Sequence, residues 1–119
     1  MTDNKGLALV TGASSGIGRS ICVELAKQGF DIFVDHYRDE SGAQETLNLV
    51  RETGRNGWSF DADVGSAEET QALFSEVAAC GKLKVLVNNA AIQTFAPLIE
   101  LAEADFDRTI RTNLKGTFL

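Results

Sequence analysis

The 119-residue sequence predicts an α/β fold in which helices cover both faces of a doubly wound parallel sheet. Short apolar runs alternate four times with amphipathic segments of helical period. Uninterrupted apolar runs are typical of strands buried on both faces, and right-handed crossovers place helices on both sides of such a sheet. These patterns predict a Rossmann-type sheet of strand order 3-2-1-4-5-6, truncated after the fourth strand and its following helix.

The apolar runs place the four strands at residues 7–11, 32–34, 58–60 and 85–87. The first helix is expected to end near Gly29. Capping boxes at residues 41–44 and 66–69 predict the starts of the next two helices. The last helix is expected to turn one stripe towards the core, formed by Phe106, Ile110, Asn113, Leu114 and Thr117. The fourth strand then has an open apolar edge, which favours self-association.

Composition indicates one compact domain over residues 1–119, because the sequence has no repeat, linker or low-complexity stretch. The 17 acidic and 11 basic residues give a net charge of −6, which argues against non-specific binding of nucleic acid. No apolar run approaches the length of a membrane span. Cys22 and Cys80 have no metal-like spacing, so no metal site is expected, and they fit a reducing cytoplasm.

A glycine-rich turn at residues 11–18 joins the first strand to the first helix and is predicted to bind a diphosphate. Gly12 lets the chain leave the strand, Gly16 lets a diphosphate approach the backbone, and Gly18 lets the helix pack closely on the sheet. Three further residues are placed to add contacts, namely Ser14, Ser15 and Ile17. No Lys-Ser/Thr pair follows the glycines, which excludes a P-loop phosphotransferase.

The spacing Gly-x3-Gly-x-Gly resembles the coenzyme motif of the short-chain dehydrogenase/reductase family. Three further segments agree in order and spacing, namely Asp63-Val64 after the third strand, Asn88-Asn89-Ala90-Ala91 after the fourth, and Asn113 in the last helix. The sequence most closely resembles glucose-dehydrogenase-like and ketoacyl-reductase-like members. The resemblance implies an NAD(P)-dependent oxidoreductase that moves hydride between the coenzyme and a small carbonyl or alcohol substrate. Residues 1–119 would be the N-terminal half of its NAD(P)-binding Rossmann domain.

The resemblance also implies a role for each matching residue. The Asp63-Val64 pair would contact the adenine ring, although Asp63 can equally cap a turn. Asn89 and Ala90 would contact the coenzyme where the fourth strand ends, and the Asn89 side chain can also satisfy backbone groups of neighbouring strands. Asn113 is similar to the residue that holds a water molecule in the family's proton relay.

The choice between NAD and NADP depends on the residue that ends the second strand. An acid there accepts hydrogen bonds from the ribose 2′-OH and repels a 2′-phosphate, whereas arginine attracts the phosphate. Counting from the first glycine of the turn puts this position at Tyr37, with Arg38 next, so NADP is preferred and NAD remains possible. Asp35 and Asp39 lie nearby, and a shift of one residue would alter the assignment. His36 is expected on the surface, without a catalytic role.

The catalytic residues of the family have no match in this sequence. Family chemistry uses a tyrosine as general acid/base, with a lysine four residues later and a serine that holds the substrate. The single tyrosine, Tyr37, is followed four residues later by Ser41. We therefore expect the 119 residues alone to be inactive. Two functions stay open: a fragment of an active oxidoreductase, in a family whose members are often homo-oligomers, or a stand-alone dinucleotide-binding module or inactive remnant.

Overall fold

A sheet of four parallel strands forms the centre of the molecule, for which a computed structural model describes residues 4–119. The strands are β1 (Leu7–Val10), β2 (Asp31–His36), β3 (Gly57–Asp61) and β4 (Leu83–Val87). They pair in the order β3-β2-β1-β4, which confirms the order predicted for the first four strands. Each strand lies at a predicted apolar run, with ends that differ by one or two residues.

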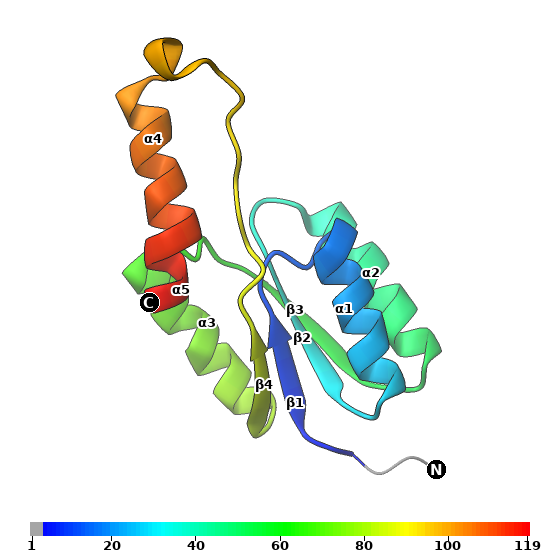
Figure 1. Ribbon diagram of the computed structural model, residues 1–119. Coiled ribbons are helices and arrows are strands. Elements are labelled where there is room, and N and C mark those ends of the chain that lie inside the picture. Colours follow the sequence, from blue (N-terminus) through cyan, green and yellow to red (C-terminus); the bar gives the residue numbers. More distant parts are fainter. Residues whose placement is uncertain (1–3) are drawn as a thin grey trace.

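Helices cover both faces of the sheet, as the sequence predicts (Figure 1). One face carries α1 (Gly16–Lys27) and α2 (Glu40–Glu52), and the other carries α3 (Ala67–Cys80). A long extended segment after β4 leads to the last elements, which are η1 (Leu98–Glu100), α4 (Glu103–Ile110), the π-helical turn η2 (Arg111–Lys115) and α5 (Gly116–Phe118). None of the helices within residues 4–119 is long and apolar enough to cross a membrane.

The core has two halves, one on each face of the sheet. On one face Ala8 and Val10 pack with residues of β2, α1 and α2, and on the other Leu7 and Leu9 pack with Phe33 and α3. Because alternate residues of β1 point to opposite faces, an uninterrupted apolar run is what this strand needs. Burial of each large apolar side chain contributes about 1.5–3 kcal/mol.

The start of α2 differs from the predicted capping box at residues 41–44. The N-cap is Asp39, whose Oδ1 accepts a hydrogen bond from the Gly42 N–H at 3.1 Å, and Ser41 lies inside the helix. The expectation that His36 lies on the surface is wrong. It is 1% exposed, and its Nδ1 accepts a hydrogen bond from the Asp39 N–H at 3.1 Å, which fixes the loop that leads into α2.

A capping box consists of two reciprocal hydrogen bonds, and one of the two predicted at the start of α3 is confirmed. Oγ of Ser66 accepts from the Glu69 N–H at 3.2 Å. The Glu69 side chain does not return to Ser66; its Oε1 accepts from the Asp63 N–H at 3.0 Å. The reciprocal bond therefore fixes the loop after β3 instead of the cap residue itself.

The prediction that the last helix turns its apolar stripe to the core is wrong. Among the stripe residues Phe106 is 53% exposed and Leu114 67% exposed, and Asn113 is also exposed. The buried residue of this segment is Gly116, where an added Cβ would lie 2.9 Å from Cγ2 of Val64. A stripe of helical period shows that one face is apolar, but it does not show which neighbour covers that face.

The open edge of β4 leads us to expect that the 119-residue polypeptide self-associates. Within the described residues β4 is an edge strand, and its Leu86 is 45% exposed. Unpaired strand edges with apolar side chains readily pair with other chains. Sedimentation velocity at increasing concentration should show oligomers, and Leu86→Lys should reduce them. A monodisperse monomer at high concentration would contradict this expectation.

Candidate functional site

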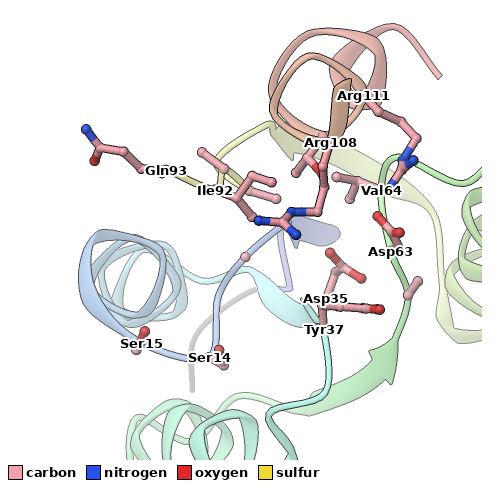
Figure 2. A pocket seen from close by; sticks show the side chains of 15 residues that line it. Ser14, Ser15, Asp35, Tyr37, Asp63, Val64, Ile92, Gln93, Arg108 and Arg111 are labelled. Atoms are coloured by element: carbon pink, nitrogen blue, oxygen red, sulfur yellow. The ribbon is translucent and has the colours of Figure 1, made fainter. Parts of the chain in front are cut away.

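A cavity of about 720 Å³ opens at the carboxyl ends of the four strands, where open α/β sheets bind ligands (Figure 2). Seven residues predicted to contact a coenzyme line it, namely Gly12, Ser14, Ser15, Tyr37, Asp63, Val64 and Ala90. The other five predicted contact residues do not line the cavity, namely Gly16, Ile17, Gly18, Arg38 and Asn89. Sequence reasoning missed several lining residues, among them Asp35, Ile92, Arg108, Arg111 and Thr112.

Two glycines of the turn after β1 have positive φ but different surroundings. Gly12 has a φ of +62°, and a Cβ there would lie 2.7 Å from Cα of Ala90. Gly16 has a φ of +56°, and beyond its chain neighbours and the backbone of its own helix no atom lies within 4 Å of the place that its Cβ would take. Gly12 therefore lets the ends of β1 and β4 approach each other, whereas Gly16 leaves open space over the backbone.

The first turn of α1 faces this open space. A Cβ at Gly18 would lie 2.5 Å from the backbone oxygen of Gly12, so the helix starts in close contact with the turn. Ser15 is the N-cap residue, but its side chain makes no capping hydrogen bond. Ile17 is 74% exposed although it is apolar. Uncapped amides and the helix dipole make such a terminus suited to an anion.

Asn89 joins the glycine turn to the end of β4 through hydrogen bonds. Its Nδ2 donates to the backbone oxygens of Thr11 and Gly12, both at 3.1 Å. Its backbone N–H and that of Ala90 donate to Oγ1 of Thr11, at 3.0 and 2.9 Å. The side-chain amide thus donates both of these hydrogen bonds to backbone groups that follow β1. This agrees with one of the two roles that the sequence suggests, namely that the Asn89 side chain satisfies backbone groups of neighbouring strands.

Arg19 of α1 holds the turn from its other side. Its Nη2 donates to the backbone oxygens of Ser14 at 2.6 Å and of Gly42 at 3.2 Å, and its Nε donates to Oγ1 of Thr46 at 3.0 Å. Oγ1 of Thr46 in turn donates to the Ala13 backbone oxygen at 2.8 Å. Sequence reasoning missed this brace, because an arginine on an amphipathic helix ordinarily faces solvent.

Tyr37 and Arg38 follow directly after β2. Tyr37 is 52% exposed and lines the cavity, and the Arg38 guanidinium lies 5.0 Å from the centre of the Tyr37 ring. Arg38 has a φ of +53°, and its N–H donates to Oδ1 of Asp61 at 3.0 Å. The stacking of guanidinium on ring holds a positive charge beside the cavity wall.

Asp63 both caps a turn and lines the cavity. Its Oδ1 accepts from the Gly65 N–H at 2.8 Å, which is the turn-capping role considered from the sequence. Val64 is 8% exposed and packs against Gly116 at the start of α5. The loop after β3 is therefore held between its own turn and the last helical segment.

Asp35 is an acid in the cavity wall that the sequence reasoning considered only as a neighbour of Tyr37. Burial raises the pKa of its carboxyl from the ordinary 3.8 to about 8. Backbone hydrogen bonds from Gly12 and Ala62 oppose this rise, and the negative charges of Asp61 and Asp63 add to it. Near neutral pH the carboxyl is therefore mostly protonated.

This raised pKa predicts that the unfolding free energy falls as pH increases from about 4 to about 8. The unfolded chain releases the Asp35 proton near 3.8 and the folded chain near 8, so the stabilisation of the protonated form is lost through this interval. Asp35→Asn should remove most of the fall and be more stable than the unmodified chain at pH 8.5, by roughly 2 kcal/mol or more. Urea unfolding of both chains at pH 5 and 8.5 measures the change in unfolding free energy between the two pH values. An equal change for the unmodified chain and for Asp35→Asn would show the expectation to be wrong.

Asn113 lies in a second cavity, of about 480 Å³, that shares Ala91, Ile92 and Gln93 with the first. Its Oδ1 accepts from the Ile92 N–H at 2.8 Å, and its Nδ2 donates to the Ile92 backbone oxygen at 2.9 Å. The side chain therefore joins the last helical segment to the extended segment after β4. Arg108 and Arg111 of the same helical segment reach towards the first cavity (Figure 2).

Comparison with known proteins gives one consistent result. Residues 6–119 match the family model of the short chain dehydrogenases. The chain is 40% identical over 112 residues to a 3-oxoacyl-(acyl-carrier-protein) reductase of Staphylococcus aureus, and 39% identical over 114 residues to a 1-cyclohexenylcarbonyl-CoA reductase of Streptomyces collinus. These matches cover 93% and 95% of this chain and 46% and 41% of the relatives. The chain thus spans less than half the length of these curated relatives.

Solved structures agree with the fold. An acetoin dehydrogenase from Enterobacter cloacae superposes with a TM-score of 0.85 at 36% identity, over all of this chain and 46% of that one. A short chain dehydrogenase from Burkholderia cenocepacia, solved in complex with NADP, superposes with a TM-score of 0.89 at 32% identity, over 93% of this chain and 46% of that one. The similarity to the 3-oxoacyl-(acyl-carrier-protein) reductase of Staphylococcus aureus agrees with the expected likeness to ketoacyl reductases. The chain belongs to the short-chain dehydrogenase family.

Proposed function

We propose that this chain is the coenzyme-binding part of an NADP(H)-dependent oxidoreductase that acts on a small carbonyl or alcohol substrate. The observation that carries the proposal is the glycine turn, in which open space over Gly16 meets the uncapped first turn of α1 beside the cavity. Two of the relatives are named as reductases, and one structural neighbour was solved with NADP. Residues 1–119 would then be the N-terminal half of the NAD(P)-binding domain.

Each part of the coenzyme has candidate contacts. The amides of residues 16–18, with Ser14 and Ser15, would hold the diphosphate, because helix N-termini favour anions. Tyr37 and the Asp63-Val64 pair would hold the adenosine, and Ala90 lies on the way to the nicotinamide end. When bound, the coenzyme supplies or accepts the hydride. Asn113 would support a proton relay by fixing the segment around Ile92.

The proposed preference for NADP over NAD is supported by the charge at Arg38. Its guanidinium is stacked on Tyr37 at the cavity wall, where it can pair with a 2′-phosphate. Calorimetric titrations with NADP⁺ and NAD⁺ should show tighter binding of NADP⁺. Arg38→Ala should reduce that preference by roughly tenfold, and the distant exposed Lys82→Ala should not. Tighter binding of NAD⁺ would overturn the preference, and binding of neither coenzyme would overturn the function itself.

A second candidate function is a stand-alone dinucleotide-binding module or inactive remnant. The family's Tyr-x3-Lys does not occur in these 119 residues, as both candidates require. We expect the purified 119-residue polypeptide to oxidise no NADPH with any small carbonyl substrate, and turnover would contradict this. The coding sequence distinguishes the two candidates, because an oxidoreductase fragment requires a serine and a Tyr-x3-Lys in the sequence that continues it.

We also propose a cytoplasmic location and a homo-oligomeric assembly. Both cysteines of the described chain, Cys22 and Cys80, are free, which fits a reducing compartment. The open edge of β4 and the exposed stripe along α4 and α5 offer apolar surface to another copy. Crosslinking of the protein in cells, followed by fractionation, tests both.

A further inference from the structure

Two backbone oxygens of the glycine turn are held from the side of α2, although no residue of α2 lines the cavity. The helices α1 and α2 lie side by side on one face of the sheet (Figure 1). Thr46, in the second turn of α2, is fully buried, and its Oγ1 donates to the Ala13 backbone oxygen at 2.8 Å. Nη2 of Arg19, in α1, donates to the Ser14 backbone oxygen at 2.6 Å, and its Nε donates to Oγ1 of Thr46 at 3.0 Å.

Gly42 lets the first turn of α2 come this close to the glycine turn. A Cβ at Gly42 would lie 2.6 Å from the Ser14 backbone oxygen, so any larger residue would push the two segments apart. The backbone oxygen of Gly42 also accepts from Nη2 of Arg19 and from Oγ1 of Thr46, both at 3.2 Å. The two side chains therefore join α2 and the turn into one hydrogen-bonded unit.

The two held oxygens determine where the next amide groups of the turn point. In a trans peptide unit, the C=O of one residue and the N–H of the next point in opposite directions. With the oxygens of Ala13 and Ser14 held on the α2 side, the N–H groups of Ser14 and Ser15 are turned away from α2. Both serines line the cavity. The direction of these two amides is thus set by side chains that lie outside the cavity lining.

We propose that Arg19 and Thr46 are positioning residues of the coenzyme site, which fix the glycine turn in the shape that binds the diphosphate before the coenzyme arrives. The inference rests on the proposed function and adds two residues that raise affinity without contacting the coenzyme. A loop that is already held in its bound shape loses less conformational freedom on binding, so the affinity is higher.

The effect of Arg19 comes from its hydrogen bonds more than from its charge. Its Nη2 pairs with Oε2 of Glu45 at 3.1 Å, so an acid already offsets the positive charge. The planar guanidinium reaches three acceptors at once, whereas the ammonium group of a lysine is a single point charge on a flexible stem. Arg19→Lys therefore keeps the charge and loses the fixed geometry.

Calorimetric titration of the 119-residue chain with NADP⁺ tests Arg19. The dissociation constant should rise roughly tenfold for Arg19→Lys and for Arg19→Met alike. Arg51→Lys is the matched control, because Nη2 of Arg51 also donates to a backbone oxygen, that of Gly57 at 2.9 Å, near the other end of α2. It should change the dissociation constant less than about twofold.

Thr46 is tested by a pair of substitutions that differ in the hydroxyl group. Thr46→Val keeps the shape and loses the hydroxyl, so the dissociation constant of NADP⁺ should rise roughly tenfold, whereas Thr46→Ser should stay within about twofold of the unmodified chain. Thr53→Val is the control, because Oγ1 of Thr53 donates to the Val50 backbone oxygen at 2.6 Å at the far end of α2. Urea unfolding of each variant gives its stability.

Amide NMR spectra without coenzyme supply a signature that a general loss of stability would not produce. The amides of Ser14 and Ser15 should shift or broaden in Arg19→Lys and Thr46→Val, and should stay in place in Arg51→Lys and Thr53→Val. If Thr46→Val does not fold, the two Arg19 variants and their control decide the outcome.

The outcomes separate this proposal from the proposed function. A dissociation constant within twofold of the unmodified value for Arg19→Lys, or for folded Thr46→Val, would overturn the positioning role of that residue. Equal losses in the Arg51 and Thr53 controls would overturn both roles, because the losses would then follow from stability alone. Failure of the unmodified chain to bind either coenzyme would overturn the proposed function, and this inference with it.

Discussion

Replacing Gly16 by alanine is expected to weaken NADP⁺ binding by about 100-fold or more while the chain stays folded. The added methyl group would occupy the open space that we assign to the diphosphate, since no atom beyond the neighbouring residues and the backbone of the same helix lies within 4 Å of it. A 100-fold loss corresponds to about 2.8 kcal/mol of binding free energy. Because Gly16 has a φ of +56°, the alanine should also cost on the order of 1 kcal/mol of stability.

Gly54 supplies a matched control for this substitution. It has a φ of +92°, its Cβ would also meet nothing within 4 Å, and it lies after α2 outside the cavity lining. Gly54→Ala should therefore lose about as much stability as Gly16→Ala and bind NADP⁺ normally. Calorimetry gives the affinities and urea unfolding the stabilities. Equal affinities for the two variants would refute the assignment of the diphosphate to Gly16.

Replacing Asn89 by aspartate is expected to destabilise the fold by about 3 kcal/mol at pH 7. The change keeps the shape of the side chain but replaces the Nδ2 donor by a carboxylate oxygen. That oxygen would lie 3.1 Å from the backbone oxygens of Thr11 and Gly12, both of which lose their donor. Each buried acceptor left unpaired costs about 1–3 kcal/mol, and repulsion by the carboxylate adds to it.

The neighbouring Asn88 shows whether the effect is specific to that position. Its side chain is exposed, so Asn88→Asp adds the same charge without opposing the two backbone oxygens. It should change the unfolding free energy by less than about 0.5 kcal/mol. Urea unfolding of both variants gives the comparison. A similar loss for both, or none for Asn89→Asp, would mean that Asn89 does not hold the glycine turn.

Much of the fold could be predicted because its signals are local. The runs at β1 and β2 are apolar without interruption, and that pattern arises when both faces of a strand are buried. The glycine spacing at residues 12–18 fixes a turn between a strand and a helix, and the structure places that turn at the cavity. These features depend on neighbouring residues in the chain, so a single sequence carries them.

The remaining features depend on distant segments. Whether Asp35 or His36 faces the cavity is set by the face of β2 on which each lies, and a single apolar run does not distinguish the two faces. Arg19 braces the turn only because α2 brings Thr46 and Gly42 beside it. The stripe around Phe106 has helical period whether or not another element covers it, so its exposure could not be predicted.

Binding of the diphosphate by the backbone amides at the start of α1 is tested most directly by amide NMR shifts during titration with NADP⁺. The largest shifts should fall on the amides of Gly16, Ile17 and Gly18, with small shifts at Gly54 and along β4. Saturable binding that leaves the amides of residues 16–18 unmoved would contradict the assignment and place the coenzyme elsewhere on the chain.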